Sequence, residues 1–116
     1  MTVDPLLFQV FERETVGVLR ADLRSWALQV MLSGLPFEAR IAARNRALRD
    51  AAAFLPAELC MAERVRQLHA ELCALARSTF PAHPDPSTLR GCLALAMLAR
   101  DRVPNLRQLR NALECD

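Results

Sequence analysis

Apolar residues recur with a helical period along most of the chain, and most regularly within residues 56–80. There they follow spacings of four, three, four and three residues, which place the side chains on one stripe of a helix: Met61, Val65, Leu68, Leu72 and Leu75. We call these five residues the 61–75 seam. Charged and polar residues fall mainly between them, so residues 56–80 are predicted to form one long amphipathic helix. We expect this helix to lie at the centre of the fold.

The first part of the chain predicts one interrupted helix. Asp4 and Pro5 suit the N-cap and the first helical position. A helical pattern then continues over residues 6–32, with a change of register near Gly17 that marks either a kink or a boundary between a short and a longer helix; we favour one interrupted helix. Trp26 is the only tryptophan, and we expect it to be an anchor in the core or in an interface.

Gly34 and Pro36 separate this helix from the next one. Gly34 suits a left-handed C-cap, and Pro36 suits the first turn of a helix over residues 36–54. The apolar side of that second helix is narrow and rich in alanine, so we expect it to lie on the surface of the bundle.

The C-terminal part predicts two further helices after a rigid connector. Three prolines within residues 81–86 exclude a helix and favour extended geometry. Ser87 suits the N-cap of a helix over residues 88–102, and a turn then leads into a short helix over residues 106–113. No run alternates like a strand. The predicted fold class is therefore all-α, a single-domain bundle of four to five helices organised around the long central amphipathic helix.

The composition fits one folded domain that covers residues 1–116, with residues 1–3 frayed. Apolar residues make up 53% of the chain, which is enough to form a core. The length of 116 residues suits one domain and is too short for two. No apolar run approaches the roughly 20 residues that span a bilayer, and the first residues lack the basic segment of a signal peptide. We therefore expect a cytoplasmic protein without a membrane partner.

All fifteen basic residues are arginine, and the net charge is +2. Coding bias would explain this, and so would selection for the planar, multi-donor guanidinium group. Four arginines fall on the helix predicted over residues 36–54, and we call them the basic stripe: Arg40, Arg44, Arg46 and Arg49. We interpret the stripe as a candidate surface for a charged partner. A purely solvated face and contact with a nucleic-acid backbone are the alternatives.

No motif indicates catalysis, a cofactor or a metal. His69 and Cys73 are four residues apart and share a helix face, and Cys60 or His83 could complete a metal site in principle. The paired ligands on tight turns that structural zinc sites use are missing, as is a glycine-rich loop for an oxyanion or a phosphate. We predict a non-enzymatic protein with no cofactor and no metal, whose four cysteines stay reduced.

The wide apolar faces of the predicted helices favour protein–protein association. We predict an interaction module, such as an adaptor, chaperone, inhibitor or regulatory subunit, that binds another protein or itself as a homo-oligomer. The 61–75 seam is the candidate association surface. A seam has the same pattern in a core and in an interface, because both exclude water, so both possibilities remain open at this stage.

The alternative is a DNA-binding regulator. Residues 88–114 have the outline of a helix-turn-helix, two helices joined by a turn at Val103 and Pro104. The second helix carries side chains that reach phosphates or base edges in such proteins: Arg107, Gln108, Arg110 and Asn111.

Overall fold

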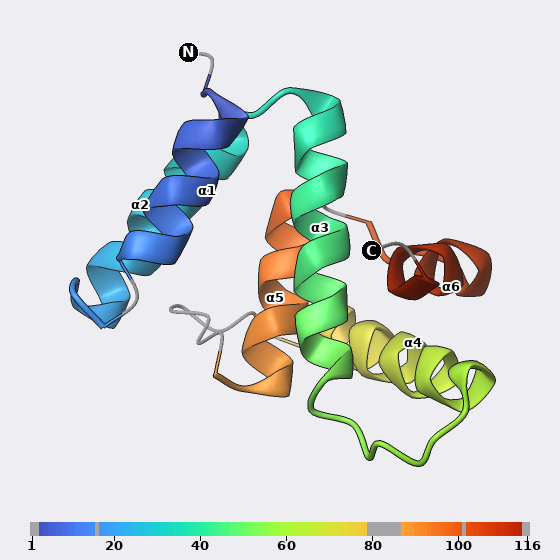
Figure 1. The fold of residues 1–116 in the computed structure, drawn as a ribbon. Coiled ribbons are helices and arrows are strands. Elements are labelled where there is room, and N and C mark those ends of the chain that lie inside the picture. The colour runs from blue at the N-terminus through green and yellow to red at the C-terminus, as the bar shows by residue number, and fades with distance from the viewer. Residues whose placement is uncertain (1–2, 16, 79–86, 101, 115–116) are drawn as a thin grey trace.

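Six helices make up the part of the chain that this computed structural model describes, residues 3–15, 17–78, 87–100 and 102–114. They are α1 (Pro5–Glu14), α2 (Ala21–Ser33), α3 (Phe37–Ala52), α4 (Met61–Arg77), α5 (Leu89–Ala99) and α6 (Leu106–Glu114) (Figure 1). No strand occurs within those ranges, so the predicted all-α class is confirmed there. The helix count exceeds the four to five expected. The connector predicted at residues 81–86 lies outside the described residues.

The extra helix arises because α1 and α2 form an antiparallel hairpin (Figure 1). The turn between them contains Gly17, whose φ of 75° lies in the left-handed region that glycine adopts without a Cβ penalty. Thr15 closes α1 by donating its backbone N–H to the carbonyl of Phe11 at 3.1 Å. The prediction of a single interrupted helix was therefore wrong: the change of register near Gly17 marks a full reversal of the chain.

Val3 and Asp4 are both held by hydrogen bonds at the start of α1. The Asp4 side chain accepts a hydrogen bond from the Leu6 N–H at 2.9 Å, which confirms the predicted N-cap. Val3 was expected to be frayed, yet it is buried and donates its N–H to the Gly34 carbonyl at 2.8 Å. Gly34 ends α2 with φ of −95°, which is right-handed rather than the left-handed C-cap that we expected. Residues 1–2 lie outside the described part.

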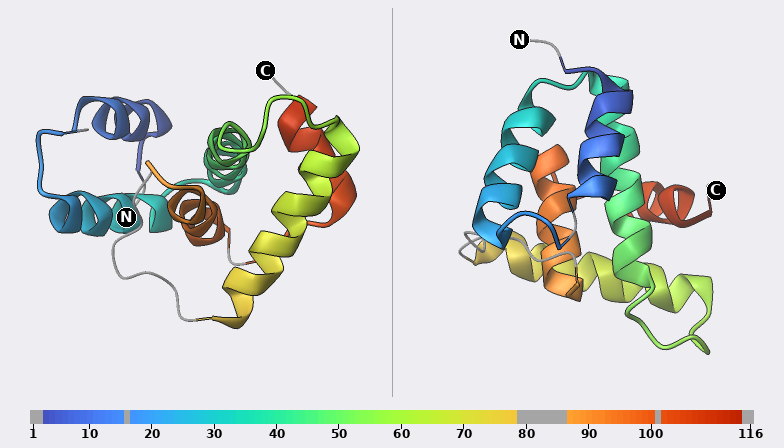
Figure 2. Two further views of the ribbon diagram at one scale, coloured as in Figure 1. Left: turned by 90° about the horizontal axis from the view of Figure 1, so that it is seen from below. Right: turned by 60° about the vertical axis from the view of Figure 1, so that its left-hand side comes forward.

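The centre of the fold is the pair of α3 and α5, which lie side by side in all views (Figures 1 and 2). The α1–α2 hairpin lies on one side of this pair, and α4 and α6 lie on the other. Burial is most complete on α5, where seven of its eleven residues are buried: Gly91, Cys92, Leu93, Ala94, Ala96, Met97 and Ala99.

The predicted central helix is thus peripheral. It begins at Met61 rather than Pro56, ends at Arg77, and packs on α5 and α6 through one face. The physical reason lies in the pattern itself, because a helix with one apolar face leaves the other face in water. A helix that is apolar on all sides, as α5 is, belongs in the interior. The N-cap of α5 is Thr88, whose hydroxyl accepts from the Gly91 N–H at 3.0 Å, rather than the predicted Ser87.

Two groups of buried side chains hold the helices together. The larger one joins α3, α4, α5 and α6 and includes four residues of the 61–75 seam, with Met61 packed against it. Val65, Leu68, Leu72 and Leu75 are at most 5% exposed, so the seam is core in this chain. The smaller group lies beneath the hairpin and contains Val3, Phe8, Leu28, Leu32, Leu35 and Ala99. Within the described ranges, no helix has both the length and the apolar character needed to cross a bilayer.

The loop between α3 and α4 is organised by Arg64. Its guanidinium donates to four backbone carbonyls at 3.1–3.3 Å: Ala52, Pro56, Ala57 and Leu59. Ala52 is the last residue of α3, and its carbonyl, which has no partner within its own helix, accepts from Arg64 and from the Leu55 N–H. Arg64, a residue of α4, thereby fixes the path of the loop that precedes its own helix.

We expect Arg64→Lys to lower the free energy of unfolding by about 1–2 kcal/mol, because an ammonium group presents its donors from one atom and cannot reach four separated carbonyls. Urea denaturation at fixed protein concentration measures the change. The matched control is Arg66→Lys, which alters an exposed ion pair with Glu63 and should cost less than about 0.5 kcal/mol. Equal losses for the two variants would contradict the bridging role of Arg64.

Candidate functional site

Large apolar side chains are exposed mainly on the α1–α2 hairpin. Among the described residues, eight of the eleven that are exposed lie between positions 6 and 30: Leu6, Leu7, Val10, Val18, Leu19, Leu23, Trp26 and Val30. Four of them follow spacings of four, three and four residues along α2 and the residues just before it. We call Leu19, Leu23, Trp26 and Val30 the 19–30 seam. Large apolar side chains exposed in this number on one hairpin are typical of an interaction surface.

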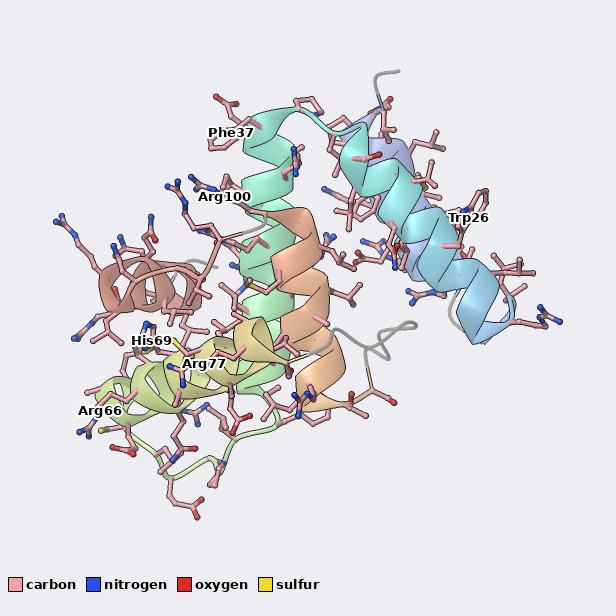
Figure 3. All side chains as sticks on the ribbon, turned by 180° about the vertical axis from the view of Figure 1, so that it is seen from behind. Trp26, Phe37, Arg66, His69, Arg77 and Arg100 are labelled. Carbon is pink, nitrogen blue, oxygen red and sulfur yellow. The ribbon has the colours of Figure 1, made fainter. Side chains whose placement is uncertain are left out.

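On α2 the usual pattern of burial is reversed: a charged residue faces the interior and large apolar residues face water. Trp26 is 65% exposed, whereas Arg24, two residues away, is only 8% exposed. Arg24, Leu28 and Leu32 follow a spacing of four residues and face the rest of the molecule. The seam residues within α2, Leu23, Trp26 and Val30, are on the opposite side of the helix, and Figure 3 shows Trp26 pointing away from α3 and α5. The outer side of the hairpin is therefore apolar.

Arg24 holds the hairpin closed. Its Nε donates to the Thr15 hydroxyl at 3.2 Å, and its Nη2 donates to the Glu12 carbonyl at 2.8 Å. These bonds cross from α2 to the end of α1. Both acceptors are neutral, and no ion pair of Arg24 with a carboxylate is found in the described part of the chain. A buried guanidinium with neutral partners keeps a positive charge on the inner side of α2.

A half-open cleft of about 490 Å³ separates the hairpin from α3 and α5. Its apolar lining comes from all four helices: Phe8, Leu28, Leu32, Ala43, Ala47, Cys92, Leu95 and Ala99. Its polar lining includes three arginines and two carboxylates: Arg13, Arg24, Arg46, Glu12 and Asp50, with Gln9 and Ser87. Arg46 on α3 forms an ion pair of 3.0 Å with Glu12 on α1, which links the two sides of the cleft.

The basic stripe does not form one exposed face, because each of its arginines is engaged within the chain. Arg40 donates to the Ala99 carbonyl at 2.9 Å, and Arg49 donates to the Ala112 carbonyl at 3.2 Å. Arg44 is 6% exposed and donates twice to the Asn45 side chain. Burial, and then the positive charge of Arg100, lowers the pKa of Arg44 below its usual value. With Arg46 paired across the cleft, three of the four arginines join α3 to other helices, and binding of a charged partner by the stripe stays a prediction.

The α5–α6 pair departs from a helix-turn-helix in its connection and its side chains. Residues 100–105 separate the helices, which is longer than the usual turn of three to four residues. Asn105 and Gln108 cap each other: the Gln108 N–H donates to Asn105 Oδ1 at 2.8 Å, and the Asn105 N–H donates to Gln108 Oε1 at 3.0 Å. Arg110 pairs with Glu114 at 3.0 Å. Arg107, Arg110 and Asn111 are exposed, while Gln108 is half-buried and engaged in the cap, so the alternative of DNA binding keeps three exposed residues of the four predicted.

His69 and Cys73 do share one face of α4, as their spacing predicted. The Cys73 sulfur lies 3.8 Å from Nε2 and 3.9 Å from Nδ1 of His69, and both side chains are half-buried. Cys60 is exposed just before α4, and His83 is outside the described residues. Where the structure describes the chain, no three His, Cys, Asp or Glu side chains come together around a common point that could hold a metal ion.

Comparisons with known proteins give no match: no family fits the chain, and no curated protein or solved structure is significantly similar to it. The site is therefore interpreted from its own residues. The sequence contained a signal for the 19–30 seam, because its spacing matches three steps of the 61–75 seam. Only the fold shows which of the two seams meets α5 and which meets water.

We expect Asn105→Ala to lower the free energy of unfolding by about 1 kcal/mol, because α6 loses the reciprocal cap made with Gln108. Thermal or urea denaturation followed by circular dichroism measures this change. Asn111→Ala is the matched control within the same helix, and it should be neutral or slightly stabilising because alanine is the better helix former. A larger loss for Asn111→Ala would show that the cap is unimportant.

Proposed function

We propose that the protein is a non-enzymatic helical interaction module that self-associates through the outer face of the α1–α2 hairpin. The observation that carries this proposal is the inversion of α2, in which Trp26 is exposed while Arg24 is buried. Removing a guanidinium from water costs free energy, and leaving a tryptophan in water forgoes the free energy of its burial. Covering the outer face in an assembly recovers the second of these.

The chemistry of the 19–30 seam favours a second copy of the chain as its partner. The four seam residues are apolar, so two copies can meet there without bringing like charges together. Their spacing of four, three and four residues lets the side chains of one helix pack between those of another. A two-fold arrangement uses the same patch on both copies and leaves no open end.

The apolar surface continues beyond α2. Leu6, Leu7 and Val10 on α1 are 48–66% exposed, and Val18 in the turn is 76% exposed. Together with the seam they offer large side chains over both helices of the hairpin, as an interface of standard size, about 800 Å² per partner, requires. The proposal replaces the 61–75 seam with the 19–30 seam as the association surface, because the former is buried within the chain.

Light scattering over a dilution series, with reductant present, tests the proposal. We expect a mass approaching twice 13.0 kDa at high concentration and a return toward one chain on dilution. Trp26→Asp should weaken the dimer by at least about thirtyfold, because it places a charge in the interface and removes a central aromatic side chain.

Phe54→Asp is the matched control, since Phe54 is an exposed aromatic residue, 49% accessible, outside the hairpin. It should leave the mass unchanged, as should a double reversal of Arg107 and Arg110 to Glu on α6. A wild-type protein that stays monomeric at every concentration would refute self-association. Dissociation by Phe54→Asp alone would place the interface elsewhere.

A further inference from the structure

The cleft behind the hairpin has polar residues at one end and apolar residues at the other. α1 and α3 run in one direction along it, while α2 and α5 run in the opposite direction (Figures 1 and 2). The charged lining residues occur late in α1 and α3 and early in α2, so they meet at the same end: Glu12, Arg13, Arg24, Arg46 and Asp50. Ser87, just before α5, lies at this end too.

The opposite end of the cleft is mostly apolar, with the uncharged Gln9 as its polar residue. Phe8 on α1, Leu28 and Leu32 on α2, and Leu95 and Ala99 on α5 line it. At about 1.5 Å per residue, the lining of α2 extends about 12 Å from Arg24 to Leu32. A volume of about 490 Å³ lies within the range of small-molecule sites, which are mostly apolar with a few polar groups that fix orientation.

The polar end is electropositive. Three arginines line it against two carboxylates, and one of those carboxylates, Glu12, is already paired with Arg46. Arg24 is buried and bonds only neutral acceptors in the described part of the chain. A guanidinium has five N–H donors, and the two bonds of Arg24 leave donors for a further acceptor. Arg13 adds an exposed positive charge at the same end. The Asp50 carboxylate there repels anions, so a ligand with a single negative charge fits better than one with several.

From these features we infer that the cleft binds a single-chain anionic amphiphile, a free fatty acid, with its carboxylate at Arg24 and Arg13 and its hydrocarbon tail between Leu28, Leu32 and Leu95. The carboxylate supplies a negative partner, in a charge-assisted hydrogen bond, where the described residues give the buried guanidinium only neutral ones. The tail covers apolar lining that water otherwise contacts. This site is on the inner side of α2, opposite the proposed dimer interface, so either inference can fail while the other holds.

Calorimetric titration of the whole protein with dodecanoate, below the concentration at which it forms micelles, tests the inference. We expect saturable binding of one molecule per chain, with dodecanol binding more weakly and dodecyltrimethylammonium more weakly still. Octanoate should also bind more weakly, by up to about fourfold for each buried CH₂ removed. Arg24→Gln should reduce the affinity for dodecanoate by at least about tenfold and leave that for dodecanol nearly unchanged.

Since Arg24 also holds the hairpin, a second variant keeps the test decisive if Arg24→Gln does not fold. Leu95→Trp fills the apolar end from a half-buried position and should abolish binding. Trp26→Asp, on the outer face, and Arg107→Gln, on α6, should bind dodecanoate like the wild type. NMR shift changes should centre on Ala43, Ala47 and Ala99. Shifts centred on Leu23 and Trp26, equal binding of the cationic amphiphile, or retained binding by Leu95→Trp would overturn the inference.

Discussion

Close packing of α3 against α5 is the constraint on which the rest of the structure depends. Both helices carry small residues at the contact, which let their backbones approach, and α5 is buried on nearly all sides. Once this pair is formed, α4 and α6 have one apolar surface to cover and the hairpin has another. The two groups of buried side chains are therefore two sides of one central pair, and the cleft lies where the hairpin covers its side incompletely.

Arginine side chains connect the helices of this arrangement, which the amino-acid composition alone does not show. Four arginines donate to backbone carbonyls near the C-terminal ends of four different helices: Arg24 to Glu12, Arg40 to Ala99, Arg49 to Ala112 and Arg64 to Ala52. The last carbonyls of a helix have no partner within it and lie at the negative end of its dipole. A guanidinium from a neighbouring helix satisfies them and joins two elements. Selection for such contacts is therefore a sufficient reason for at least part of the arginine content.

The sequence predicted the helical class, the N-cap at Asp4 and a burial pattern for α4 that the structure shows as core. It failed where the outcome depends on a neighbour. Gly17 is compatible with a kink and with a reversal, and the contacts that favour the reversal come from residues distant in the sequence, such as the bonds of Arg24 to the end of α1 and the packing of Phe8, Leu28 and Ala99. The 61–75 and 19–30 seams have similar spacings, but the 61–75 seam packs against α5 and the 19–30 seam is exposed to water. The cleft was not predictable, because its residues come from four helices whose directions are set by the fold.

The position of α5 along the chain has a consequence for how the protein is made. Synthesis proceeds from the N-terminus, so α1 to α4 leave the ribosome before the helix that they pack against exists. Until residue 99 has emerged, the apolar faces of α3 and α4 and the inner side of the hairpin lack their common partner. Exposed apolar surface in an incomplete chain promotes aggregation. The packing of α3, α4 and the hairpin described above is therefore completed only after α5 has left the ribosome.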